Sequence, residues 1–281
     1  MKFLNQYIND FRLSDSDAQK RLADLLDETR SNYNIFASSN PIDGLEAFVQ
    51  RYNWLGDNTN KQTFNFSQNL SRNLTAALMQ DYLVNLIIKL CESYPQLDVF
   101  SEVRVPFGTY PIWEAGQVYY RTPSERSDIA VGYLIEDGKI KLSDEPYPKQ
   151  PIYKLLKNQT VVPISTINSK IRISQSEFFD WLGRGQLMNR GNPHCLSVQI
   201  ALRKEMDLTI VEASQASRKF FLFGDGGERS VIPNQAELQR FIQIFTEHLS
   251  ERMDEPNIEI ADSEDDTVTE TQLEIDFESD N

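Results

Sequence analysis

The sequence predicts an α/β protein in which a mixed sheet flanked by helices follows a helical N-terminal region. Apolar residues recur at helical spacing through much of the first ninety residues. The period then changes, because Val99, Val103 and Val105 alternate with polar residues as in a strand. Later strand-like segments alternate with amphipathic helices, which favours a sheet covered by helices.

Each predicted element rests on a local pattern. Ser14 is a candidate N-cap for the first helix, and the helix from about Leu70 carries leucines on one face that must be buried. The predicted helices cover residues 14–30, a segment after Pro41, 70–93, 174–189 and 235–252. The predicted strands cover residues 98–107, 127–135, 139–142, 160–170, 194–202 and 218–224, with a turn at Asp137-Gly138.

The net charge of −14 is concentrated at the C-terminus. Twelve of the 42 acidic side chains and no Lys or Arg lie in residues 254–281, so residues 1–253 hold 30 acidic and 28 basic residues. We expect a helical region at 1–66, a core at 67–253 and an unfolded acidic tail at 254–281. The tail serves solubility, or it covers a basic groove until a polyanion displaces it. A nearly neutral body leaves room for a local nucleic-acid site.

The composition excludes several other classes. The two cysteines cannot form a disulfide framework, which favours a cytoplasmic protein. No signal peptide, transmembrane run, zinc spacing, phosphate loop or nucleophile elbow is recognised, so we expect no membrane partner.

Polar residues that suit metal-assisted chemistry fall on two of the predicted strands. Asp128 begins one strand, while Thr166, Asn168 and Lys170 share one face of another. If these strands are neighbours, Asp128, Asn168 and Lys170 converge at one edge of the sheet. A carboxylate there can hold Mg²⁺, and a lysine beside the metal can orient an attacking water.

Asp128, a polar-x-Lys strand end at 168–170, an amphipathic helix and a further apolar strand together resemble the PD-(D/E)xK nuclease core. The chain is most similar to type II restriction endonucleases, including two-subunit enzymes that cut asymmetric sites. LTAALMQDYLVNLI and NRGNPHCLSVQIAL correspond to flanking segments, and the resemblance covers residues 70–205. It implies a restriction-endonuclease-like mixed sheet and Mg²⁺-dependent, sequence-specific hydrolysis of double-stranded DNA.

The sequence departs from that family pattern at the metal site. Ser127 precedes Asp128, where the family has proline, and Asn168 stands where an acid is expected. An amide oxygen can bind Mg²⁺ without contributing charge, so a second carboxylate is needed. Glu177 is the first candidate for both the catalytic and metal sets, and Asp81 and Glu102 are the others. The alternative is that Asn168 marks an inactive site.

Basic and polar side chains near this edge are candidates for DNA contacts. Arg172 continues the register of Lys170 and is expected to bind phosphate. Arg184, Gln186 and Arg190 on the following helix are expected to track the DNA backbone or read guanine edges. Each of these three side chains is equally explained as part of a solvated helix face. Tyr119, Tyr120 and Arg121 are weaker candidates, because a Tyr-Tyr pair is common in ordinary strand packing.

Cleavage of both DNA strands requires two active sites, so we expect a homodimer or a second nuclease subunit. The resemblance also implies a companion DNA methyltransferase. Two other functions remain open at this point: a non-catalytic DNA-binding subunit of a nuclease complex, and an interaction protein that acts through its acidic tail.

Overall fold

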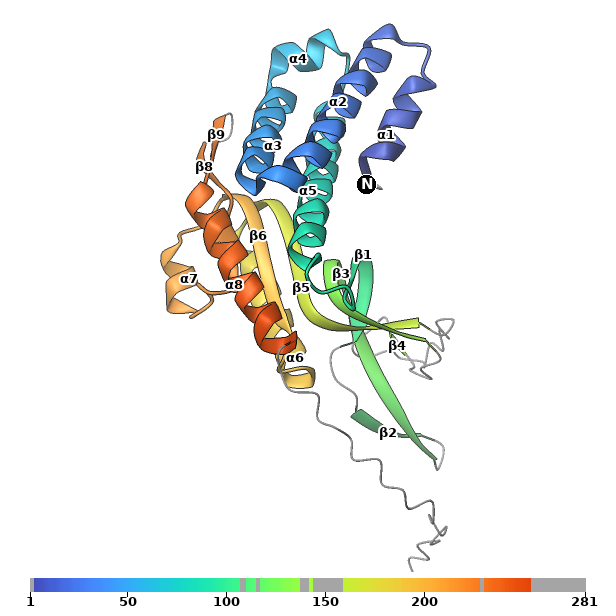
Figure 1. Cartoon of the computed structure of the whole chain (residues 1–281), viewed down its shortest axis with the longest axis vertical. Coiled ribbons are helices and arrows are strands. Elements are labelled where there is room, and N and C mark those ends of the chain that lie inside the picture. The colour runs from blue at the N-terminus through green and yellow to red at the C-terminus, as the bar shows by residue number, and fades with distance from the viewer. Residues whose placement is uncertain are drawn as a thin grey trace, which may run out of the picture.

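The computed structural model describes residues 3–106, 110–114, 117–136, 142–143, 159–227 and 230–253. Five helices precede a mixed sheet whose later strands alternate with helices (Figure 1). The helices are α1 Phe3–Arg12, α2 Asp17–Ser39, α3 Pro41–Gly56, α4 Asn58–Thr63, α5 Gln68–Cys91, α6 Gln175–Gly191, α7 Thr209–Ala213 and α8 Gln235–Met253. The strands are β1 Asp98–Pro106, β2 Tyr110–Glu114, β3 Gln117–Glu136, β4 Leu142–Ser143, β5 Gln159–Ile173, β6 Leu196–Lys204, β7 Phe220–Leu222, β8 Gly224–Gly227 and β9 Ser230–Pro233.

The main sheet has the strand order β1-β3-β5-β6-β7. β1 and β5 run antiparallel to β3, whereas β5, β6 and β7 run parallel to one another. The short strands β2 and β4 pair with β3, and β8 and β9 form a separate hairpin. The predicted fold class, a mixed α/β sheet flanked by helices, is therefore confirmed.

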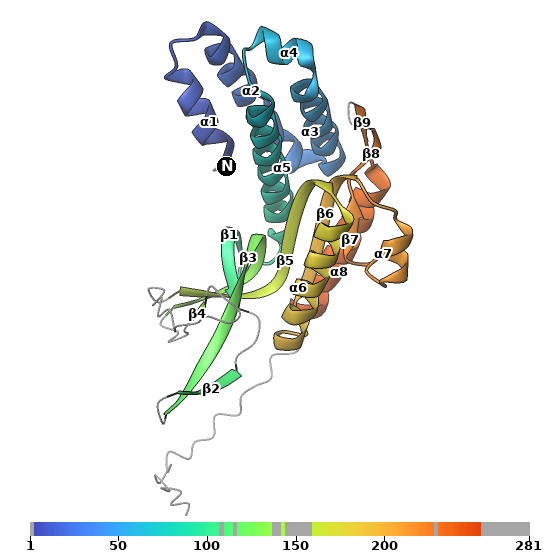
Figure 2. The ribbon, with the colours of Figure 1, turned by 180° about the vertical axis from the view of Figure 1, so that it is seen from behind.

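Helices cover both faces of this sheet. α8 lies in front of β6 in Figure 1, and α6 lies in front of it when the molecule is turned around in Figure 2. One hydrophobic cluster joins α8 and the N-terminal helices to one face, and it includes Ile167 and Phe241. A second cluster joins Phe178 and Trp181 of α6 to Phe220 of β7. Trp181 is thus a core residue. The candidate site lies at the edge of the sheet, between the two layers of helices.

The sequence locates β5 correctly, and the packing around it explains a bulge. The register between β3 and β5 shifts between Val131 and Gly132. A Cβ atom at Gly132 would lie 2.1 Å from the carbonyl oxygen of Val162, so only glycine permits this close approach. The bulge therefore depends on the absence of a side chain at this position.

The longest apolar helix differs from expectation in one respect. α5 is long and apolar enough to span a membrane by length and composition, although we expected no such segment. Of its most apolar window, 61% is buried inside the protein. Leu74, Leu78 and Leu86 lie in the main hydrophobic cluster, so one face of α5 belongs to the core, whereas Ile88 is exposed.

Two predicted features fall wholly or partly outside the described residues: the acidic tail at 254–281 and the turn and returning strand at 137–142. Leu142, the last residue of that returning strand, begins β4 and pairs in parallel with Thr122. The antiparallel partner of the end of β3 is instead β5, where Glu136 pairs with Gln159. The boundary expected at residue 66 stays a prediction, because one hydrophobic cluster runs across it.

Candidate active site

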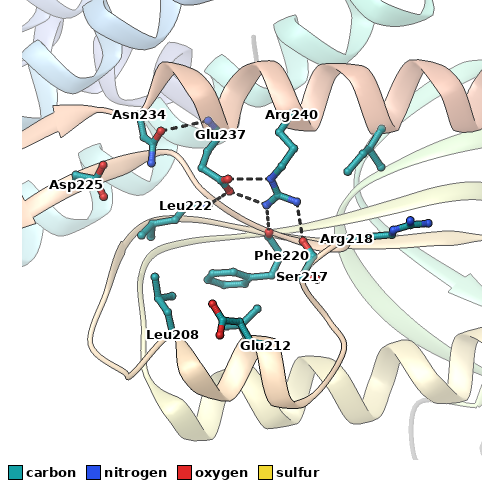
Figure 3. Close-up of a pocket in the computed structure, with 12 residues that line it drawn as sticks. Leu208, Glu212, Ser217, Arg218, Phe220, Leu222, Asp225, Asn234, Glu237 and Arg240 are labelled. Atoms are coloured by element: carbon teal, nitrogen blue, oxygen red, sulfur yellow. Dashed lines mark hydrogen bonds and ion pairs between the residues drawn. The ribbon is translucent and has the colours of Figure 1, made fainter.

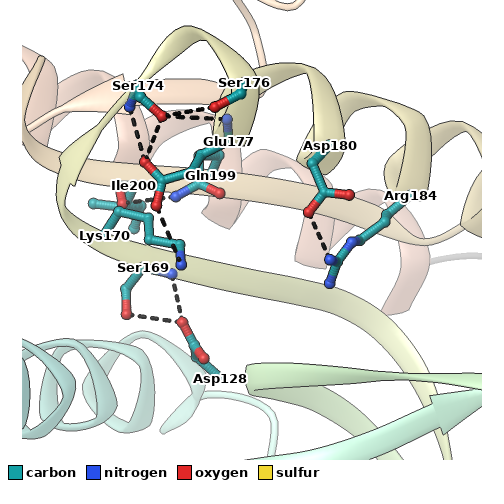
Figure 4. Close-up of polar contacts among 10 residues, drawn as sticks. All are labelled: Asp128, Ser169, Lys170, Ser174, Ser176, Glu177, Asp180, Arg184, Gln199 and Ile200. Carbon is teal, nitrogen blue, oxygen red and sulfur yellow. Dashed lines mark hydrogen bonds and ion pairs between the residues drawn. The ribbon is translucent and has the colours of Figure 1, made fainter. Parts of the chain in front are cut away.

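Asp128 occupies the point where two strands of the sheet separate. The β3–β5 ladder ends at the pair Ile129 and Ile167. Beyond that pair, Oδ2 of Asp128 accepts hydrogen bonds from the backbone N–H of Ser169 at 2.7 Å and from the Ser169 hydroxyl at 3.0 Å. The carboxylate thereby replaces the next ladder bond and is held beside β5, one residue before Lys170 (Figure 4).

A second carboxylate lies on the other side of Lys170. Nζ of Lys170 is 3.8 Å from Oε1 of Glu177, and both side chains are partly exposed. The sequence Ser174-x-x-Glu177 places this acid by a capping box at the start of α6. Oε2 of Glu177 accepts hydrogen bonds from the backbone N–H and the hydroxyl of Ser174, both at 2.9 Å. Glu177 is therefore held at the helix end that faces Lys170.

The electrostatics of Glu177 favour its charged form. Burial alone would raise its pKa, but the hydrogen bonds from Ser174 and the positive charges of Lys170 and Arg172 outweigh burial, so the pKa of Glu177 is lowered. At neutral pH, Lys170 therefore faces an ionised carboxylate.

Asn168 and its partner on the adjacent strand β6 are both polar. Asn168 pairs in register with Gln199 of β6. Gln199 is only 1% exposed, and its side-chain amide donates to the carbonyl oxygen of Ile200 at 3.1 Å. Sequence reasoning missed Gln199, although a glutamine inside the apolar run LSVQIAL is a usable signal for a buried polar position.

The two alternative acids have other roles. Asp81 is 1% exposed, and its Oδ2 accepts a hydrogen bond from the backbone N–H of Leu4 at 3.0 Å. Burial raises the pKa of Asp81. Glu102 has a left-handed backbone with φ of 52° and forms an ion pair with Arg126 at 2.9 Å. Within the described part of the chain, Glu177 is the only one of these three acids that contacts Lys170.

Two of the predicted DNA-contact residues form ion pairs, and two others are described by their exposure on α6. Arg172 pairs with Glu205 at 3.1 Å, and Arg184 pairs with Asp180 one turn earlier on α6 at 2.5 Å. Gln186 and Arg190 are exposed on α6. Their exposure fits either a DNA contact or a solvated face. The side chains of Tyr119, Tyr120 and Arg121 lie outside what the structure describes.

The residues fit a metal site with few protein ligands. No group of three or more His, Cys, Asp or Glu side chains that could hold a metal occurs in the described ranges. Mg²⁺ usually takes only one or two carboxylates and fills its remaining positions with water and substrate phosphate. Among the described residues, no hydrogen bond to Oδ1 of Asp128 occurs, which leaves this oxygen for such an ion. The oxygen donors therefore suit Mg²⁺ or another hard cation, and the set lacks the thiolate and imidazole ligands that softer metals prefer.

A large pocket lies elsewhere, between α7 and α8. It has a volume of about 610 Å³ and is lined by residues such as Leu208, Phe220 and Arg240. Arg240 donates to the carbonyl oxygens of Ser217 and Phe220 and pairs with Glu237, as Figure 3 shows. The guanidinium group of Arg240 therefore connects α8 to β7. The lining of this pocket contains no predicted site residue.

The comparison with solved structures gives a likeness, whereas the comparisons by sequence do not. No protein-family model matches the sequence, and no curated protein matches it significantly. Among solved structures, the chain is similar to a chain of the native BbvCI A2B2 tetramer, with a TM-score of 0.45 and 10% sequence identity. The likeness covers 89% of this chain and 97% of that chain. It assigns no role to an individual residue.

Proposed function

We propose that this chain is a Mg²⁺-dependent, sequence-specific endonuclease that hydrolyses double-stranded DNA, as a type II restriction enzyme or as one subunit of such an enzyme. The observation that carries the proposal is the arrangement of Asp128, Lys170 and Glu177 where β3 and β5 separate. Asp128 is bound to the backbone of β5, and Glu177 lies 3.8 Å from the Lys170 ammonium.

In this proposal, Asp128, Asn168 and Glu177 would hold Mg²⁺, and the ion would supply positive charge that stabilises the scissile phosphate. Lys170 donates hydrogen bonds to the attacking water and stabilises its developing hydroxide character. The Ser169 amide fixes the Asp128 carboxylate, and the Ser174 cap fixes Glu177, so neither acid has to be ordered when DNA binds. Arg172, Arg184, Gln186 and Arg190 supply DNA contacts.

A single site cuts one strand, so cleavage of a duplex requires a second copy of this chain or a different nuclease subunit. A companion DNA methyltransferase and a cytoplasmic location belong to the same proposal.

The test is digestion of a DNA of known sequence by the purified chain, with Mg²⁺ and with a chelator. We expect discrete fragments that require Mg²⁺, and we expect Asp128→Asn to remove cleavage while DNA binding persists. Cleavage by Asp128→Asn at the wild-type rate, or fragments formed in chelator, would contradict the proposal. Asn168 favours one second candidate, a non-catalytic DNA-binding subunit. That candidate predicts binding without cleavage until a partner subunit is added.

A further inference from the structure

A second, polar pocket lies between the helical N-terminal region and the ends of two sheet strands. It has a volume of about 600 Å³. One wall comes from α3, α4 and the first turns of α5, and the other comes from β5 and β6. Segments more than 90 residues apart in sequence thus build one site, and one of them is the strand that carries Lys170.

Four cationic side chains line this pocket against one acidic side chain. The cations are Lys61, Arg72, Arg172 and Arg203, and the acid is Asp57. Asp57 already caps α4, because its Oδ1 accepts hydrogen bonds from two backbone N–H groups, at 2.6 Å from Thr59 and at 3.3 Å from Asn60. The lining therefore carries a net positive charge, while the body of the protein is close to neutral.

Two of these cations lie next to each other on neighbouring strands of the sheet. Arg172 and Arg203 pair in the β5–β6 register, and like charges directly opposite each other are unfavourable in a sheet. A single carboxylate, Glu205, pairs with both guanidinium groups, at 3.1 Å and 3.4 Å. Glu205 thus contributes one negative charge beside two positive charges at this edge of the pocket.

The other two cations stand on helices. Nζ of Lys61 donates to the carbonyl oxygen of Gly56 at 2.8 Å and to Oδ1 of Asn58 at 3.5 Å, and both of these partners are uncharged. Arg72 is exposed on α5, and no acidic partner contacts it among the residues that the structure describes. An anion in the pocket would therefore give Arg72 a charged partner.

The pocket is close to the candidate active site along β5. Arg172 follows Lys170 by two residues, a distance of about 7 Å along a strand. Successive phosphates on one DNA strand are spaced by about 3.4 Å along the helix axis. A DNA strand with its scissile phosphate at Lys170 therefore brings a neighbouring phosphate within reach of Arg172 and the pocket.

We propose that this basic pocket binds a backbone phosphate of the DNA, so that the helical N-terminal region forms one wall of the DNA-binding groove. The proposal rests on the proposed nuclease function. Arg72 and Lys61 contact the phosphate from the helices, while Arg172 and Arg203 contact it from the sheet. A free phosphate or a mononucleotide presents the same chemistry, and the experiment separates these sources.

The test compares Arg72→Ala with Lys20→Ala in the full-length chain. Both changes remove one exposed positive charge from a helix, but Lys20 lies on α2 outside the pocket. Binding of a fluorescent duplex is measured without Mg²⁺ at several salt concentrations. Each lost phosphate contact reduces the slope of log K against log salt by about 0.9. Between 50 and 200 mM salt, the wild-type affinity should therefore fall about 3.5-fold further than that of Arg72→Ala.

We expect Lys20→Ala to keep the wild-type slope and Arg72→Lys to restore most of the affinity. Equal DNA binding by wild type and Arg72→Ala would overturn the pocket assignment and leave the nuclease proposal standing. No DNA binding by the wild type would overturn the nuclease proposal itself. ATP and inorganic phosphate are titrated in parallel. If Arg72→Ala loses binding of either ligand but keeps its DNA affinity, the pocket is a free-anion site and the DNA assignment is overturned. Far-ultraviolet circular dichroism checks folding, and Arg72→Gln repeats the test if Arg72→Ala is misfolded.

Discussion

Ser174→Ala tests whether the capping box holds Glu177 beside Lys170. The Ser174 hydroxyl donates to Oε2 of Glu177 at 2.9 Å and accepts from the Glu177 backbone N–H at 3.4 Å. Loss of a serine N-cap costs about 1 kcal/mol, within a range of about 0.5–2 kcal/mol. For a protein of this size, that loss lowers the melting temperature by about 2–4 °C. Thermal unfolding followed by circular dichroism at pH 7 measures it.

The same variant has a defined pH dependence. Because the pKa of Glu177 is lowered in the fold from its ordinary value of 4.5, ionised Glu177 stabilises the protein above that pH. This stabilisation is lost as the pH falls below 4.5 and through the lowered pKa. Ser174→Ala removes part of it, so the gap in stability between wild type and variant should shrink in that window.

Ser176→Ala is the matched control, because the Ser176 hydroxyl is exposed and, within the described part of the chain, forms a hydrogen bond only with the Ser174 hydroxyl, at 3.2 Å. It should change stability by less than about 0.5 kcal/mol. Equal melting temperatures for the two variants, or a gap between wild type and Ser174→Ala that widens in acid, would refute this role of the cap.

Three further predictions concern the bulge, the α1 contact and the tail. Gly132→Ala should destabilise by at least about 2 kcal/mol in urea unfolding, because its Cβ meets a backbone oxygen at 2.1 Å. Gly183→Ala, with open space in a helix, should instead stabilise by about 0.5–1 kcal/mol, and the reverse order would contradict the bulge geometry. Asp81→Ala should cost about 1–3 kcal/mol in the same assay, since the buried N–H of Leu4 loses its acceptor, and a neutral result would exclude that contact. Deletion of residues 254–281 should tighten non-specific DNA binding at low salt, whereas unchanged affinity would favour a solubility role.

Much of the sheet was predictable because apolar and polar residues alternate within the strand segments of the sequence. The core strands and α5, α6 and α8 lie close to their expected positions. α1 and α4 were not predicted individually. α1 is held by a contact from Leu4 to Asp81, 77 residues away, and the polar α4 depends on its Asp57 cap. The polar α4 buries no residue and has no apolar period, whereas Leu4, Ile8 and Phe11 of α1 are buried at helical spacing, a signal that sequence reasoning missed.

The candidate site was predictable in part. The alternation in β5 and its pairing with β3 bring Lys170 and Asp128 to one edge, as expected. The Asp128 contact to Ser169 was not expected, because Ser169 alternates with Asn168 and Lys170 and so belongs to the opposite face of the strand. A backbone N–H donates in the plane of the sheet whichever way its side chain points, and it becomes available only where the ladder ends. That ending depends on how two strands diverge, which no local pattern encodes.

The basic pocket was also invisible to sequence reasoning. Arg172 was expected to bind phosphate, but Arg72 and Lys61 lie more than 90 residues earlier in the sequence. Only the docking of the helical region against β5 and β6 brings them together.

The most direct test of the central claim is DNA cleavage by Lys170→Ala, with Lys204→Ala as the control. Lys204 is exposed at the end of β6 and lies outside the Asp128 and Glu177 contacts. Proton-transfer and water-activating groups typically contribute about 10²–10⁴-fold to rate. With Mg²⁺ and saturating DNA, Lys170→Ala should therefore cleave at least about 100-fold more slowly than wild type, while Lys204→Ala cleaves normally. Wild-type cleavage by Lys170→Ala would contradict the assignment of this site.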